Sequence, residues 1–129
     1  MNRRRSWAVA LTVIIACGIL SRTFQTGFVL VDKYLGDALY ASMAYAILRV
    51  IWPFASPYRV AASAMVVMTA LEFFQLTMIP ARLFTSDNSA LRIAARLMGT
   101  EFSVADIAAY ALGIACILLI DRRTSPMPR

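Results

Sequence analysis

The chain has 129 residues, of which 60% are hydrophobic, and its formal net charge of +6 arises from 13 Lys and Arg against 7 Asp and Glu. This composition excludes an ordinary soluble domain and favours an integral membrane protein. Because the basic residues lie mainly beside apolar runs, they indicate membrane orientation and contact with lipid phosphates, and no nucleic-acid partner is predicted.

The sequence has few residues that could form a metal site or a disulfide. It has no His, and its two cysteines, Cys17 and Cys116, both lie inside apolar segments. We interpret them as small apolar packing residues, and a His/Cys metal site is excluded. A carboxylate site for a hard cation is not excluded by this reasoning, but no metal site and no cofactor is predicted.

The first predicted span covers residues 7–21. Three arginines at 3–5 precede it, and positive charge ahead of an apolar segment holds that end in the cytoplasm. The alternative is a secretory signal segment, because Ile-Ile-Ala-Cys at 14–17 resembles a lipoprotein-processing box, which leaves processing at Cys17 open. The uncleaved helix is favoured because the apolar run continues beyond this cysteine and no small-x-small cleavage site follows.

Two further spans are predicted at residues 34–52 and 58–79, because each apolar run ends at a proline, the later one at Pro80. Residues 23–33 are mixed in character and indicate an external connection. Arg49 lies near the end of the second span, where we expect its side chain to snorkel to the cytoplasmic surface.

A short amphipathic segment separates the third and fourth spans. In residues 91–98, Arg92 and Arg96 share one side of a helix and apolar residues cover the other, which predicts an interfacial helix stopped by Gly99. The fourth span is predicted at residues 102–120.

Together these segments predict an all-α fold, with residues 1–129 forming a single transmembrane domain. We expect a four-helix bundle with both ends in the cytoplasm. Eight Lys and Arg residues then lie inside and five outside, in the direction of the positive-inside rule. The predicted location is the bacterial cytoplasmic (inner) membrane, with a multi-pass topology.

This topology places polar side chains in the outer half of the bundle. Asp37 and Asp106 lie near the outer ends of their helices, while Glu72 and Gln75 lie ~12 Å and ~7 Å below the outer end of the third span at the rise of an α-helix. Asp106 and Tyr110 are four residues apart and share a face. A carboxylate within a membrane is costly unless it is paired or faces a polar cavity. We predict that these five side chains form a ligand-binding cluster.

Each carboxylate also has a structural interpretation. Glu72 in a buried pair with an arginine such as Arg96 would have no ligand to bind. Asp37 and Asp106 in the first turns of their helices would serve only the helix dipoles, and Ser103 and Asp106 form the capping pattern S-x-x-D. The candidate residues for a phosphate or lipid head group are Arg82, Arg92 and Arg96.

Three motifs occur in order along the chain: Gly36-Asp37-Ala38-Leu39-Tyr40, Glu72-x-x-Gln75-Leu76 and Gly99-x-x-Phe102-Ser103-x-x-Asp106-x-x-Ala109-Tyr110-x-x-Gly113. Together they resemble an uncharacterised family of small bacterial membrane proteins, a domain of unknown function sometimes labelled YjgA-like ribosomal maturation. A looser likeness extends to VanZ-like membrane proteins. The resemblance covers residues 7–120 and implies a four-helix membrane protein without an established activity. The ribosomal label finds no support, because no soluble basic domain is present to hold RNA.

The first functional hypothesis is a membrane protein that binds a lipid or lipid-linked amphiphile at the outer leaflet. The second is an enzyme that uses Glu72 and Asp106 as an acid/base pair on a lipid-linked substrate. The third is a subunit of a cation- or proton-coupled transporter. The expected partners are membrane lipids, and assembly as a homo-oligomer or within a larger membrane complex stays open.

Overall fold

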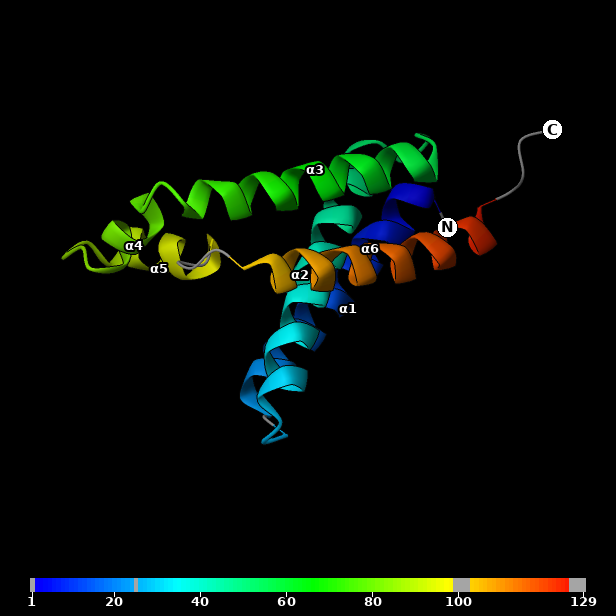
Figure 1. Ribbon diagram of the computed structural model, residues 1–129. Helices are drawn as coiled ribbons and strands as arrows, with labels where there is room; N and C mark the ends of the chain where they lie inside the picture. The colour runs from blue at the N-terminus through cyan, green and yellow to red at the C-terminus, as the bar shows by residue number, and fades with distance from the viewer. Residues whose placement is uncertain (1, 25, 99–102, 126–129) are drawn as a thin grey trace.

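The computed structural model describes residues 2–24, 26–98 and 103–125, and all regular structure in these ranges is α-helical (Figure 1). The helices are α1 (Arg3–Thr23), α2 (Val29–Ile51), α3 (Pro57–Gln75), α4 (Ile79–Phe84), α5 (Ser89–Met98) and α6 (Val104–Thr124). The prediction of an all-α fold is confirmed, and the amphipathic segment 91–98 lies within α5. Its predicted stop at Gly99 and the predicted start of the fourth span at residue 102 lie outside the described residues.

The third long helix ends earlier than expected. α3 stops at Gln75, and Met78 takes a left-handed backbone conformation with φ 62°. Pro80 therefore does not end this helix but lies in the first turn of α4. A proline fits there because the first turn of a helix needs no amide hydrogen bond from that residue.

The connection between α1 and α2 is shorter than the sequence indicates. The Asp32 carboxylate accepts hydrogen bonds from the Thr26 amide at 2.9 Å and the Gly27 amide at 3.3 Å. Gly27 has φ 87°, a conformation that favours glycine. These contacts fold the connection back onto the first turn of α2, so that the helix starts at Val29 and not at residue 34.

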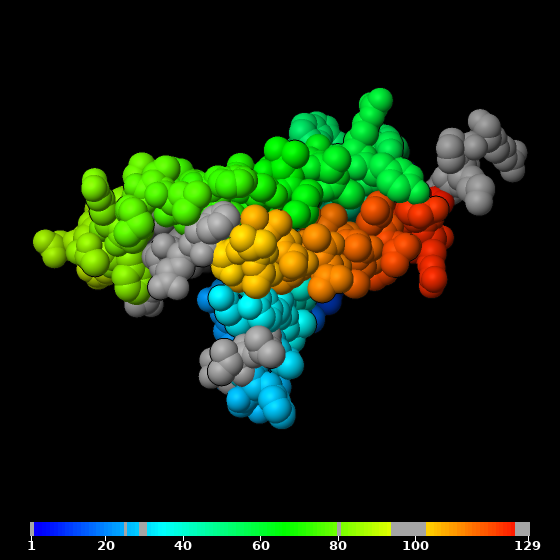
Figure 2. Space-filling model, viewed as in Figure 1, coloured from blue at the N-terminus to red at the C-terminus, as the bar shows by residue number. Residues whose placement is uncertain are grey.

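The four long helices form two pairs. α2 contacts α1, α3 and α6, and α3 contacts α6. The pair α3 and α6 runs side by side, whereas α1 and α2 leave it at a steep angle, so the two pairs diverge away from the chain ends (Figure 1). The structure therefore differs from a bundle of four near-parallel helices. Figure 2 shows α6 packed between α3 and the α1–α2 pair.

α1 runs antiparallel to α2, and α3 runs antiparallel to α6, while α2 and α6 cross each other at a steep angle (Figure 1). Lys33 and Asp106 meet near the N-terminal ends of α2 and α6, and Arg49 and Asp121 meet near their C-terminal ends. At the second of these ends the start of α1 meets the residue after α6, because Arg3 Nη2 donates to Ser125 Oγ at 2.8 Å.

Small residues allow α2 and α6 to approach closely. A Cβ atom added at Gly113 would lie 2.3 Å from the Ala38 carbonyl oxygen, and Ser42 Oγ donates to the Gly113 carbonyl at 3.3 Å. Close contact through small residues and hydroxyl hydrogen bonds is typical of helices packed within membranes. The larger core residues, among them Tyr45 and Met68, fill the space between α2, α3 and α6.

Much of the helix surface is apolar. In the described part of the chain two helices, α1 and α6, are long and apolar enough to cross a membrane. α1 has no buried residue, and the side chains of Val9, Ile19, Val66 and Leu112 are 54–68% exposed. Apolar surface of this extent indicates contact with lipid or with another protein.

Candidate functional site

Five polar side chains from three helices come together near the N-terminal ends of α2 and α6. We call this group the acidic cluster. Its members are Lys33 and Asp37 from α2, Glu72 from α3, and Asp106 and Tyr110 from α6. Four of them were predicted from the sequence as parts of one site, and the structure brings these four together.

Glu72 is fully buried and has a partner on each oxygen. Oε1 accepts from the Tyr110 hydroxyl at 2.5 Å, and Oε2 accepts from the Ser103 amide at 3.2 Å. Ser103 is the N-cap residue of α6, but its own side chain makes no capping hydrogen bond. The predicted capping pattern is therefore replaced by a carboxylate from α3, which also meets the positive end of the α6 dipole.

The other two carboxyl groups of the acidic cluster lie against each other. The carboxyl group of Asp37 lies within interaction range of that of Asp106, and Asp106 Oδ1 is 3.3 Å from Lys33 Nζ. The carboxyl group of Asp37 interacts electrostatically with those of Asp106 and Glu72. In the described part of the chain, Lys33 is the cation beside them.

In the described part of the chain, two acceptors of the acidic cluster lack a hydrogen-bond donor, Asp37 Oδ2 and Asp106 Oδ1, and Lys33 Nζ lies 3.3 Å from the second of them. Asp37 Oδ2 is buried and accepts no hydrogen bond from a donor group in the described part of the chain. A buried acceptor without a donor costs free energy, which a ligand with N–H or O–H groups would recover.

The predicted residue Gln75 is buried at the C-terminal end of α3, about one turn beyond Glu72. Its place in the ligand-binding cluster stays a prediction.

Two of the three predicted phosphate-binding arginines have described side chains. Arg82 is exposed on α4. Arg92 donates to the carbonyls of Ser86 at 2.9 Å and Asp87 at 3.2 Å, so its guanidinium group holds the turn before α5. The side chain of Arg96 lies outside the described residues, and the predicted pairing with Glu72 stays untested.

A second polar group, which we call the arginine cluster, consists of Tyr45, Arg49 and Asp121. Arg49 is completely buried and forms an ion pair with Asp121, to which its Nε donates at 2.7 Å. Tyr45 also donates to Asp121, and Arg49 Nη1 donates to the Ala55 carbonyl at 2.5 Å. The prediction that Arg49 snorkels to the surface is wrong, because a carboxylate from α6 lies within reach.

Sequence reasoning missed both the arginine cluster and Lys33 as parts of polar sites. The sequence does contain one pattern that indicates the arginine cluster. Tyr45 and Arg49 are four residues apart on one face of α2, and Asp121 directly follows the apolar run of α6. If the C-terminal ends of α2 and α6 are taken to lie together, these residues fall at the same level.

Residues 27–114 match a family model described as "Protein of unknown function (DUF2809)". No curated protein and no solved structure matches the chain. The matched range includes the whole acidic cluster, whereas all of α1 and Asp121 of the arginine cluster lie outside it. The likeness to VanZ-like proteins stays a prediction.

Proposed function

We propose, from the premise that the chain belongs to this family of unknown function, that it spans a bacterial inner membrane four times and binds a lipid or lipid-linked amphiphile. In this proposal both chain ends lie in the cytoplasm. The acidic cluster then lies in the outer half of the membrane and receives the polar head of the ligand. The whole chain acts as one transmembrane domain.

Helix lengths support the four spans. α2 has 23 residues and α3 has 19, which correspond to ~34 Å and ~28 Å at 1.5 Å per residue, close to the ~30 Å of a hydrocarbon core. The two cap residues of α2, Phe28 and Trp52, are exposed aromatics. Aromatic side chains favour the two membrane interfaces, so they mark the ends of a span.

The directions of the helices support the topology. α1 runs opposite to α2, and α3 runs opposite to α6 (Figure 1), so the two members of each pair alternate in direction, as successive membrane crossings require. The arginine cluster and the contact between Arg3 and Ser125 then share the cytoplasmic side. The acidic cluster, near the N-terminal ends of α2 and α6, then lies on the other side.

The observation that carries the binding proposal is the open acceptor Asp37 Oδ2. It is buried beside two other carboxyl groups, an environment that attracts a cationic or hydroxyl-rich head group. Phosphatidylethanolamine offers N–H donors to such an acceptor, whereas phosphatidylcholine offers none, and sugar head groups offer O–H donors.

The proximity of the Asp37 and Asp106 carboxyl groups favours a second candidate function. A pair that holds one proton is able to act as a general acid and base on a lipid-linked substrate. It also suits a proton-coupled transport subunit. Residues Ala41, Ala64 and Met68 in the middle of α2 and α3 are buried and apolar, which favours a site on one side of the membrane over a continuous path through one protomer.

The binding proposal is tested with the Asp37→Asn variant, which keeps the shape of the side chain but weakens the acceptor. Each protein is purified in mild detergent and titrated with phosphatidylethanolamine or phosphatidylcholine under native mass spectrometry. Wild-type protein should prefer phosphatidylethanolamine, and Asp37→Asn should lose this preference. Asp87→Asn changes an exposed carboxylate away from the acidic cluster and should behave as wild type. Equal binding of the two lipids by the wild-type protein, or an unchanged preference in Asp37→Asn, would contradict the proposal.

A further inference from the structure

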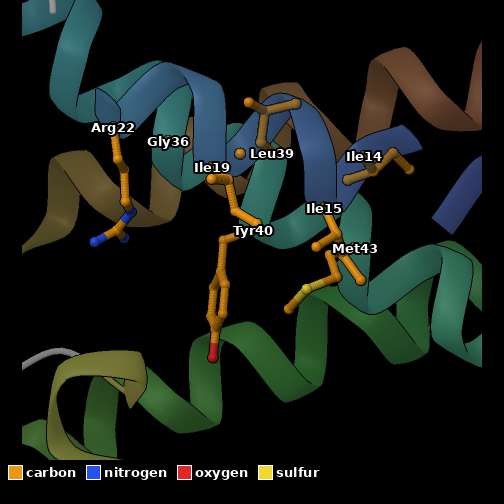
Figure 3. A pocket seen from close by; sticks show the side chains of 9 residues that line it. Ile14, Ile15, Ile19, Arg22, Gly36, Leu39, Tyr40 and Met43 are labelled. Carbon is orange, nitrogen blue, oxygen red and sulfur yellow. The ribbon is translucent and has the colours of Figure 1, made fainter. Parts of the chain in front are cut away.

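A groove runs along the α1–α2 pair, on the side of α2 away from α6. Its volume is about 240 Å³. The apolar walls come from Ile14, Ile15 and Ile19 of α1 and from Leu39 and Met43 of α2 (Figure 3). No residue of the acidic cluster lines it, so it is a separate feature of the molecule.

Two polar side chains stand along this groove. Arg22 and Tyr40 extend to the same side of the α1–α2 pair (Figure 3), and Tyr40 is close enough to Arg22 for an electrostatic interaction. Arg22 is exposed and forms no ion pair with any residue in the described part of the chain. The Arg22 guanidinium supplies charged hydrogen-bond donors for a phosphate, and the Tyr40 hydroxyl, which lies apart from it in Figure 3, adds a further donor along the groove.

The polar and apolar parts of the groove are separated along the helix axis. Arg22 lies in the last turn of α1, and Ile14 lies eight residues earlier, ~12 Å away along the axis at the rise of an α-helix. This separation is close to the thickness of one leaflet, about half of the ~30 Å hydrocarbon core. The groove therefore has a charged end at head-group depth and an apolar end near the membrane centre.

The size of the groove limits what it holds. Pockets for complete small molecules usually measure ~300–1,000 Å³, so a smaller groove suits one chain of a larger ligand. Gly18 and Gly36 lie along it, and a Cβ atom at either position would meet nothing within 4 Å. The missing side chains leave room along the groove, and the exposed Ile15 and Ile19 open it to the surrounding lipid.

We infer that this groove binds one acyl chain of an anionic phospholipid in the outer leaflet, with Arg22 on its phosphate and the Tyr40 hydroxyl as a further donor along the groove. The unpaired arginine at the end of an apolar channel carries the assignment, because its charge complements an anionic head and not a cationic one. The inference rests on the membrane placement proposed above, but not on ligand binding by the acidic cluster.

The test is a titration of detergent-purified full-length protein with phosphatidylglycerol, followed by native mass spectrometry. Arg22→Gln should bind this lipid about tenfold more weakly, because a charge-assisted contact to the phosphate is lost. Gly18→Leu should weaken binding to a similar extent by filling the groove, and it keeps the fold because the position is open. Ala16→Leu, which adds the same side chain at an exposed position outside the groove, should bind as wild type.

Further measurements distinguish lipid binding in the groove from binding of a free phosphate and from ligand binding by the acidic cluster. Glycerol phosphate, which has the phosphate without a chain, should not compete with phosphatidylglycerol. Asp37→Asn should leave phosphatidylglycerol binding unchanged, and Arg22→Gln should leave any preference for phosphatidylethanolamine unchanged, so either proposal is able to fail alone. Unchanged binding in Gly18→Leu would overturn the inference, as would competition by glycerol phosphate at concentrations similar to those of the lipid.

Discussion

At the scale of single residues, the two polar clusters differ in how well their charges are compensated. In the arginine cluster, Arg49 and Asp121 balance each other, and further hydrogen bonds go to Tyr45 and to backbone carbonyls. In the acidic cluster, three carboxyl groups face one described lysine, and Asp37 Oδ2 has no donor. We therefore assign stability to the first cluster and ligand binding to the second.

Removing one partner of the Arg49–Asp121 pair should strongly destabilise the protein. Arg49→Met leaves a carboxylate buried without its cation, which costs about 3–5 kcal/mol, whereas the double variant Arg49→Met/Asp121→Leu removes both charges and should recover most of the loss. The measurement is thermal unfolding of the single and double variants in detergent. A double variant as unstable as Arg49→Met would show that the pair does not act as a unit.

The hydroxyl of Tyr110 should stabilise the buried carboxylate of Glu72. Tyr110→Phe removes the donor to Oε1 and is expected to lower stability by about 1–3 kcal/mol, the cost of a buried acceptor without a partner. Tyr58→Phe, at a tyrosine that is 57% exposed, is the matched control for thermal unfolding. Equal melting temperatures for the two variants would mean that the hydrogen bond contributes little.

Residue-level prediction from sequence succeeded where helical periodicity was sufficient. Asp106 and Tyr110 share a face by their spacing, and Glu72 had to be partnered because it lies in the middle of an apolar run. Prediction failed for Arg49, whose partner Asp121 lies 72 positions away. Such a contact depends on how two helices pack, and a single sequence does not fix it.

At the scale of helices, the crossing of α2 and α6 positions both clusters. Gly113 lies close to the Ala38 carbonyl, and the acidic and arginine clusters lie towards opposite ends of the two helices from this contact. The position of this crossing therefore determines which residues of the two helices meet.

Gly113→Ala should separate the two helices. The added methyl group would lie 2.3 Å from the Ala38 carbonyl oxygen, and overpacking of this kind costs about 1–3 kcal/mol. Gly18→Ala adds the same group where nothing lies within 4 Å, so it should leave stability unchanged or raise it slightly through helix propensity. Thermal unfolding of both variants provides the comparison, and a Gly113→Ala variant as stable as Gly18→Ala would refute the close contact.

Helix boundaries were predictable only where the sequence signal had one meaning. Pro53 follows the end of α2 as expected, since proline disfavours continuation of the helix. Pro80 is ambiguous in the sequence, because proline is common both after the end of a helix and in the first turn of one. In the structure the chain turns at Met78, and Pro80 lies in the first turn of α4. The amphipathic pattern of 91–98 had one meaning, and α5 is a helix as predicted.

At the scale of the whole molecule, the two helix pairs converge at the end that holds both chain termini and diverge at the other end (Figure 1). The arginine cluster and the contact between Arg3 and Ser125 hold the converging end. The acidic cluster and the polar end of the α1–α2 groove both lie towards the diverging end. A protein that takes ligands from one leaflet would have its polar sites on one side in this way.

The central claim is that the chain crosses the membrane four times with the acidic cluster on the outer side. Single cysteines at Asn88 and Ser56, in a background without Cys17 and Cys116, test it directly through labelling with a membrane-impermeant maleimide. With this topology, Asn88→Cys should react in intact cells of the expression host, and Ser56→Cys should react only after the membrane is made permeable. The reverse pattern, or reaction of both cysteines in intact cells, would contradict the account.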